Sequence, residues 1–186
     1  MKLVFGSDIH GSASAAQNLA AAYAYEGADK LVLCGDLLYH GPRNDLPEDY
    51  NPKKVIEILN SMSDKIIAVR GNCDGEVDQM VLDFPVGADY TLIYADGIRM
   101  YVTHGHVYSP EKPMKLSGAD VLISGHTHVL KALKTDGFYY VNPGSAALPK
   151  ENNPKSYAVY ENGRFAIKTF GREIIRELDA AVGSEK

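Results

Sequence analysis

The stretch that decides the fold is YVTHGH, residues 101–106, in which an apolar run stops at Thr103 and two histidines follow around a glycine. A second stretch, SGHTH at residues 124–128, repeats this order after another apolar run. Four of the six histidines in the chain lie in these two stretches. Each stretch predicts a short buried strand that ends in a tight turn and presents imidazole groups.

Three earlier stretches have the same order of apolar strand, glycine-assisted turn and polar side chain. VFGSDIHG at residues 4–11 supplies Asp8 and His10, LVLCGD at 31–36 supplies Asp36, and IAVRGN at 67–72 supplies Asn72. In α/β sheets, ligands bind at the carboxyl ends of the strands. We therefore expect these segments, although distant in sequence, to build one site from five strand ends.

Length and composition predict a single domain, residues 1–186. A chain of this size with 45% hydrophobic residues can bury about 70% of its unfolded surface. The net charge of −5 excludes a broad basic surface for nucleic acids. No segment has the roughly 20 apolar residues of a membrane span, and the N-terminus is too polar for a signal peptide. We expect a soluble protein that does not bind membranes.

The cysteines predict the compartment. Cys34 and Cys73 form neither a CxxC motif nor a disulfide framework, which favours the reducing cytoplasm. Twelve tyrosines leave room for an interface in a homo-oligomer.

Turn and capping signals predict the order of the elements. Asp96-Gly97 and Asn162-Gly163 each separate two apolar runs, which indicates two β-hairpins, 90–94 with 98–103 and 157–160 with 165–170. One helix is expected from Ser12 or Ser14 to residue 26, and another from residue 52 with Asn51 as its N-cap. Further strands are expected at residues 2–7, 30–34, 66–69, 121–124 and 138–141.

Three weaker signals complete the secondary-structure prediction. Residues 76–82 and 111–116 are expected to form short helical segments, and residues 174–178 a strand or a helix. Residues 182–186 are expected to fray. The βαβαβ opening followed by strand pairs predicts an α/β (α+β) fold, a two-sheet β-sandwich of mixed strands flanked by helices.

The polar side chains at the strand ends form a set of nitrogen and oxygen donors without a thiolate. The set is too large for one tetrahedral zinc ion. Two divalent ions with five or six ligands each and one shared carboxylate would use the whole set and leave room for water, which is the usual hydrolytic arrangement. The donors suit Mn²⁺, Fe, Co²⁺, Ni²⁺ or Zn²⁺. The candidate metal ligands are Asp8, His10, Asp36, Asn72, His104, His126 and His128.

Five motifs, taken in order, resemble the calcineurin-like metallophosphoesterase superfamily. They are DxH at residues 8–10, GD at 35–36, GN at 71–72, HGH at 104–106 and GHTH at 125–128. GNCD at 71–74 and HGPRN at 40–44 are most similar to the small bacterial YfcE-type phosphodiesterases. The resemblance spans residues 2 to about 150 and implies a β-sandwich flanked by helices.

The resemblance also implies how the ligands divide between two metals. One ion would be held by Asp8, His10, Asp36 and His128, and the other by Asp36, Asn72, His104 and His126, so that Asp36 bridges. Two such cations would lower the pKa of a bridging water to near neutrality and clamp the phosphoryl oxygens. The bridging hydroxide would then attack the phosphorus in line, without a phosphoenzyme.

The sequence departs from the superfamily at Cys73, where most members have a histidine that protonates the leaving oxygen. A thiol is a poor acid for an alkoxide, so we predict that His106 supplies this proton or that good leaving groups depart unaided. Residues 35–39, GDLLY, also fit the GDxxY motif of purple acid phosphatases, whose tyrosine binds ferric iron. The DxH motif argues against that family and favours Tyr39 as a residue on the rim of the pocket.

Three residues are candidates for contact with the substrate. Arg43 follows a stiff glycine–proline turn and would bind phosphate, unless it is simply a solvated charge. Cys73 is expected in the pocket wall, with a very weak contact to the metal as the alternative. His40 would lie on the rim or be an ordinary hydrogen-bonded histidine. The neighbouring Asp74 is expected to cap the helix at 76–82.

The sequence thus predicts a dinuclear, metal-dependent phosphoesterase that acts on a small phosphoester, with Mn²⁺ preferred and Asp36, Asn72 and His106 as catalytic residues. Phosphodiesters are favoured because a monoanion suits a site without an evident row of basic residues. A phosphomonoesterase or nucleotidase at the same site is the alternative. A non-catalytic scaffold, such as the retromer subunit that resembles this superfamily but has lost ligand histidines, is the rival. No ligand position is vacant here, which favours the enzyme.

Overall fold

The structure, a computed structural model, describes residues 1–180 and contains two β-sheets. The first sheet consists of β1 (Lys2–Gly6), β2 (Lys30–Leu33), β3 (Ile66–Ala68), β9 (Ser156–Glu161), β10 (Arg164–Thr169) and β11 (Ile174–Asp179). The second consists of β4 (Tyr90–Ala95), β5 (Ile98–Thr103), β6 (Val121–Ile123), β7 (Lys131–Lys134) and β8 (Tyr139–Asn142). Their strand orders are β11-β10-β9-β1-β2-β3 and β4-β5-β6-β8-β7.

Both sheets mix parallel and antiparallel pairs, which confirms the predicted sandwich of mixed strands. In the first sheet β1, β2 and β3 run parallel, whereas β9 pairs antiparallel with β1 and β10. In the second, β5, β6 and β8 run parallel, and β4 and β7 are antiparallel edge strands. The two predicted hairpins are β4–β5 and β9–β10.

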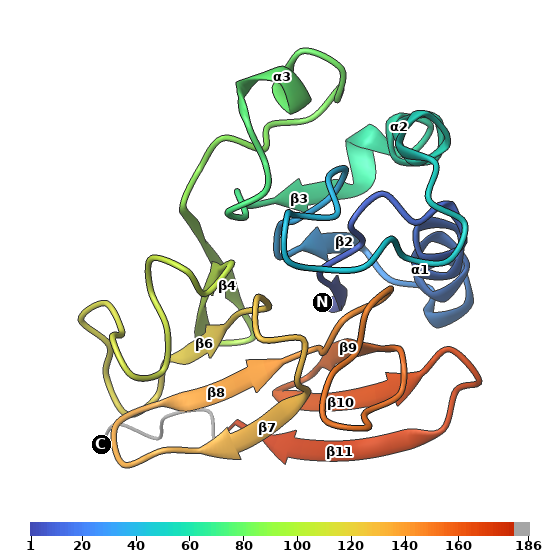
Figure 1. The fold of residues 1–186 in the computed structure, drawn as a ribbon. Coiled ribbons are helices and arrows are strands. Elements are labelled where there is room, and N and C mark those ends of the chain that lie inside the picture. The colour runs from blue at the N-terminus through green and yellow to red at the C-terminus, as the bar shows by residue number, and fades with distance from the viewer. Residues whose placement is uncertain (181–186) are drawn as a thin grey trace.

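The described residues form three α-helices, of which the first two cover one side of the first sheet. They are α1 (Ala13–Glu26), α2 (Pro52–Asn60) and the single turn α3 (Glu76–Gln79), with a 3₁₀ turn at Ser63–Lys65. Figure 1 shows α1 and α2 side by side against the strands β1–β3. The predicted caps are confirmed, since the Ser12 and Asn51 side chains accept the backbone N–H groups of Ala15 and Lys54.

The core forms two layers because alternate residues of β1 face opposite sides of its sheet. Val4 packs in the layer beneath α1 and α2, with Leu19. Leu3 and Phe5 pack in the other layer, between the sheets, against residues such as Val102 of β5. All five side chains are fully buried. This sandwich holds the ends of β1, β2, β5 and β6 in fixed relation, which is what a site built from strand ends requires.

Two parts of the secondary-structure prediction need comment. No helix forms at residues 111–116, so that prediction was wrong. Pro113 supplies no backbone N–H for a helical hydrogen bond there, and the chain makes a tight turn in which Ser109 and Lys112 exchange backbone hydrogen bonds. Residues 174–178 belong to strand β11, and the predicted fraying at 182–186 lies outside the described residues.

Two surface features bear on partners. Within residues 1–180 no helix is both long enough and apolar enough to span a membrane. On the edge strand β4, Tyr90, Leu92 and Tyr94 are exposed. A homo-oligomer remains a prediction.

Candidate metal centre

The predicted ligands gather where the parallel strands of both sheets end. Asp8 and His10 follow β1, Asp36 follows β2, and Asn72 lies beyond β3, whereas the remaining three histidines follow β5 and β6 in the other sheet. The loops after β1 and β2 are joined directly, because the backbone N–H groups of Asp8 and His10 donate to the carbonyls of Gly35 (3.1 Å) and Asp36 (2.9 Å). The sandwich thus brings together segments more than 100 residues apart.

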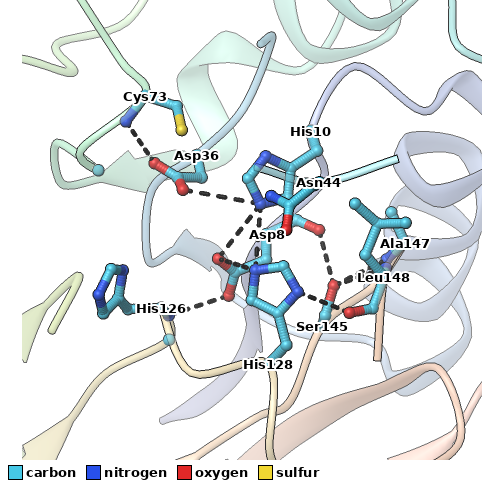
Figure 2. A network of polar contacts seen from close by, with 12 residues as sticks. Asp8, His10, Asp36, Asn44, Cys73, His126, His128, Ser145, Ala147 and Leu148 are labelled. Atoms are coloured by element: carbon cyan, nitrogen blue, oxygen red, sulfur yellow. Dashed lines mark hydrogen bonds and ion pairs between the residues drawn. The ribbon is translucent and has the colours of Figure 1, made fainter. Parts of the chain in front are cut away.

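Most of the predicted ligands have a positive backbone φ angle, in the left-handed region. Left-handed φ angles of this kind cost L-residues about 1 kcal/mol or more each and tend to occur at functional sites. Five of the seven predicted ligands adopt them: Asp8 (57°), His10 (50°), Asp36 (57°), His126 (67°) and His128 (61°). Left-handed residues directly after strands turn their side chains inward, as Figure 2 shows for Asp8, His10, Asp36 and His128.

A first cluster consists of Asp8, His10 and His128. The Nδ1–H groups of His10 and His128 donate to the backbone carbonyls of Tyr39 (2.8 Å) and Leu148 (2.6 Å). Because the protons are on Nδ1, both Nε2 atoms carry lone pairs. These two Nε2 atoms lie 3.2 Å apart. Asp8 Oδ1 lies 3.3 Å from Nε2 of His128 and 3.7 Å from Nε2 of His10, and it is buried with no hydrogen-bond partner among the described residues.

A second cluster forms around His104. Its Nδ1–H donates to the carbonyl of Cys34 (2.7 Å), so its Nε2 also points inward. This Nε2 lies 3.1 Å from Asn72 Oδ1, 3.2 Å from His126 Nδ1 and 3.4 Å from Asp36 Oδ2. The same Asp36 Oδ2 lies 3.6 Å from Nε2 of His10. One carboxylate oxygen therefore stands between the two clusters.

These atoms fit divalent cations. The Nε2 lone pairs of His10, His104 and His128 point inward, toward the unpaired carboxylate oxygen of Asp8. These groups repel one another unless a positive charge lies among them. Three overlapping groups have ligand atoms within 4.8 Å of one another: Asp8-His10-His128, Asp8-Asp36-His104 and His10-Asp36-Cys73. The first two contain only nitrogen and oxygen donors, as expected for such metals.

The electrostatics of the protein groups lead to the same conclusion. Burial would raise the pKa of Asp8, but His128 and His104 hold it well below its ordinary value. Burial lowers the pKa of His10, which favours the neutral, ligating form. Burial also opposes protonation of His104, but Asp36 and Asp8 outweigh it and raise its pKa to about 9. In the metal-free protein this proton lies on the inward Nε2 of His104 and offsets part of the carboxylate charge, and a bound cation would displace it so that Nε2 can act as a ligand.

Two buried residues outside the predicted ligand set support the ligands. The Asp74 carboxylate accepts the backbone N–H groups of Asp36 (2.7 Å), Leu37 (2.8 Å) and Gly71 (2.7 Å). The predicted helix-capping role of Asp74 was therefore wrong, and the N-cap residue of α3 is Gly75. Ser145 Oγ donates to the Asp8 carbonyl (2.9 Å) and accepts from the Leu148 N–H (2.8 Å), as Figure 2 shows.

A cavity of about 320 Å³ opens over the clusters. Two of the three predicted substrate contacts, Arg43 and Cys73, line it. Lys150 also lines it, and it was not predicted because its position follows only from the fold. The site therefore does have basic residues, contrary to the premise behind the preference for diesters. The lining residues are Asp36, Gly41, Pro42, Arg43, Asn44, Asn72, Cys73, His126, His128 and Lys150.

Other predicted residues lie elsewhere. His40 does not line the cavity; its ring contacts those of Tyr39 and Tyr50, with centroids 4.7 and 5.3 Å away. Tyr39 itself is exposed and serves the site through its carbonyl. His106 is exposed outside the lining set, with its ring centroid 5.4 Å from that of His104.

Comparison with known proteins fits this geometry. Residues 1–163 match the family described as the calcineurin-like phosphoesterase superfamily domain. The chain belongs to this superfamily. Membership implies divalent metal ions, in agreement with the ligand clusters, and confirms the resemblance found in the five motifs.

Individual relatives cover nearly the whole chain. Phosphodiesterase YfcE of Escherichia coli K12 is 49% identical over 167 residues, 90% of this chain and 91% of that protein. A solved structure of YfcE, a phosphoesterase from E. coli, superposes with a TM-score of 0.95 at 44% identity, covering 97% of this chain and 100% of that one. The probable metallophosphoesterase YsnB of Bacillus subtilis is 27% identical over 186 residues, 94% of this chain and 95% of that one.

A more distant structure shares the fold alone. Vacuolar Protein Sorting 29 from Cryptosporidium parvum superposes with a TM-score of 0.62 at 16% identity, over 96% of this chain and 97% of that one.

Proposed function

We propose that this protein is a metal-dependent phosphodiesterase with two divalent ions at the site. The observation that carries the proposal is the Asp36 oxygen between the inward Nε2 atoms of His10 and His104. Asp8 and His128 would complete the ligands of one ion, and Asn72, His104 and His126 those of the other. The relationship to the phosphodiesterase YfcE supports the same reaction class.

The chain's own groups set up the reaction. Bound divalent ions would supply positive charge for the phosphoryl oxygens and acidify a water molecule. The backbone carbonyls of Tyr39, Cys34 and Leu148 fix the tautomers of three ligand histidines, which keeps their Nε2 atoms available. Water attacks the phosphorus in line, the bond from phosphorus to the leaving oxygen breaks, and that oxygen takes up a proton.

Mn²⁺ is our proposed metal, supported by an all nitrogen and oxygen donor set in both clusters. A cytoplasmic location is supported by the two free thiols, Cys34 and Cys73. A single domain is supported by β11, which extends the first sheet beyond the residues that match the superfamily.

The rival proposal is a scaffold without catalysis on the same fold. The fold shared with the vacuolar sorting protein allows it. Every predicted ligand is present here, and five of them have left-handed backbone angles of the kind that tend to occur at functional sites. The ligand set therefore favours the enzyme.

Removing metal tests the proposal directly. We expect protein treated with a chelator to hydrolyse bis(p-nitrophenyl) phosphate only at background rate, and Mn²⁺ to restore turnover at about two ions per chain. The measurement is p-nitrophenolate release together with elemental analysis of the dialysed protein. A phosphodiesterase should turn over this diester faster than the monoester p-nitrophenyl phosphate. Turnover that is independent of metal would contradict the proposal, and no turnover under any loading would leave the scaffold.

His106 is our candidate for the group that protonates the leaving oxygen. Burial raises the pKa of the Cys73 thiol to about 12, with help from Asp36, so Cys73 is a weak acid here. We expect His106→Ala to leave the rate with p-nitrophenyl esters almost unchanged and to slow alkyl esters by about 100-fold, since only alkoxides need a proton. Rates plotted against leaving-group pKa should steepen in the variant. An identical slope in both proteins would rule out this role.

A further inference from the structure

Two cationic side chains without partners lie over the site at different points of the cavity wall. Arg43 comes from the loop between β2 and α2, and Lys150 from the loop between β8 and β9. Both are exposed, and within residues 1–180 neither side chain forms an ion pair or a hydrogen bond. Unpaired cations at a cavity are available to an anionic ligand.

Local contacts hold both loops in place. The loop of Arg43 packs closely against Cys73. The approach is so close that a Cβ atom placed on Gly41 would lie 3.1 Å from the Cys73 Sγ. Lys150 donates its backbone N–H to the carbonyl of His128 (3.1 Å), and Asn153 bonds back to the Lys150 carbonyl (2.7 Å). One cation therefore belongs to the Cys73 side of the cavity and the other to the His128 side.

These cations stand above the reacting centre. The atoms that converge at the metal centre belong to buried residues, with Asp8 at 0% and Asp36 at 2% exposure, whereas Arg43 and Lys150 are exposed. A phosphorus atom held against the buried ligands would lie on the cavity floor. The part of the substrate that extends outward would meet the two cations at the rim.

The remaining lining restricts what that part can be. Around the cavity there is no phenylalanine, tyrosine, leucine, isoleucine, valine or methionine among the lining residues. Pro42 and Cys73 are the apolar side chains among these lining residues, so an acyl chain would find little apolar surface there. A diester phosphate carries one negative charge, which the centre on the floor can match without the rim.

We infer that the substrate is a small phosphodiester whose alcohol portion carries a second anionic group, a carboxylate or a phosphate, and that Arg43 and Lys150 bind this group. The inference rests on the proposed phosphodiesterase function and narrows it to a substrate class. Arg43 thereby contacts a remote anion rather than the reacting phosphate. Binding energy from a remote group of this kind raises kcat/KM for substrates that carry it.

Three substrates with the same leaving group isolate this contact. Propyl, carboxyethyl and phosphonoethyl esters of p-nitrophenyl phosphate differ in the charge of the retained alcohol and share their chemistry. We expect the wild type to prefer either anionic ester over the propyl ester by about 10-fold in kcat/KM, with the preference shrinking at high salt. Arg43→Gln and Lys150→Gln should each reduce this preference by about 3- to 5-fold. Lys53→Gln, an exposed lysine on α2 outside the cavity, is the matched control and should keep it.

A binding measurement makes the outcome independent of turnover. By calorimetry, the wild type should bind carboxyethylphosphonate more tightly than propylphosphonate. Arg43→Gln and Lys150→Gln should each reduce this difference by the same factor as in the kinetic experiment. An equal loss for charged and neutral esters would place the cations on the reacting phosphate and overturn the inference. If both variants keep the wild-type preference for anionic esters, Arg43 and Lys150 are merely solvated charges, and the inference is also overturned. If no ester is hydrolysed, the proposed function fails, while the phosphonates still test the anion site.

Discussion

Replacing Asp36 with asparagine is expected to lower kcat for bis(p-nitrophenyl) phosphate by about 1,000-fold or more, because even partners outside the ligand set are commonly worth 10- to 100-fold. Asparagine has nearly the same shape, so the bond from the Cys73 N–H to Oδ1 (2.8 Å) can persist. The lost feature is the charge on Oδ2, between the imidazoles of His10 and His104. Steady-state kinetics and metal content per chain are the measurements, and we expect fewer than two ions bound.

The fold of this variant should survive. Burial and the Asp8 charge raise the pKa of Asp36, but the hydrogen bond with His104 outweighs them and holds this pKa below its ordinary value. The Asp36 charge therefore stabilises the metal-free form, and its removal should lower the melting temperature of that form without unfolding the protein. Asp83→Asn removes the same charge from an exposed side chain and is the control for net charge. Full activity and full metal content in Asp36→Asn would mean that the two clusters do not share a carboxylate.

The sequence predicted which side chains converge at the strand ends, because each one is specified locally. A glycine and a polar residue directly after an apolar run place a side chain at a strand end, and parallel strands end at a common edge. The two hairpins were equally local, since Asp96-Gly97 and Asn162-Gly163 favour tight turns. Strand β7 was missed because its four residues, with lysines at both ends, lack a strand pattern of their own. It is placed by pairing with β8.

The supporting contacts could not be predicted because they join distant segments. Ser145 reaches the Asp8 carbonyl across 137 positions, and His104 bonds to the Cys34 carbonyl across 70. Lys150 enters the cavity because its backbone bonds to His128. Asp74 was assigned to the nearest helix, as local capping rules suggest, whereas three amides of two loops hold its carboxylate. Local rules identify which residues carry chemistry, but they do not reveal which residues hold them.

Asp74→Asn is the second substitution expected to have a large effect. Its effect is indirect, because Asp74 positions the loop that carries the predicted ligand Asp36. Oδ2 of Asp74 accepts the N–H groups of both Asp36 and Gly71, so it ties the loop after β2 to the loop after β3. Asn has one acceptor oxygen and one NH₂ donor, so at least one of the three amides would face a donor. The left-handed backbone of Asp36, at a φ of 57°, would then lose part of its support.

We expect this variant to bind metal about 10- to 100-fold more weakly, as is typical when a group that orients a ligand is lost. Calorimetric titration with Mn²⁺ measures the affinity, and activity should recover toward wild type at saturating metal, which it would not do after loss of a ligand. Asp78→Asn is the matched control, because within residues 1–180 that buried carboxylate accepts only the Gly75 N–H (2.6 Å), in the same turn. Both variants should lose about 1–3 kcal/mol of unfolding free energy, but only Asp74→Asn should lose metal affinity. Equal metal affinities in the two variants would reduce Asp74 to a structural residue.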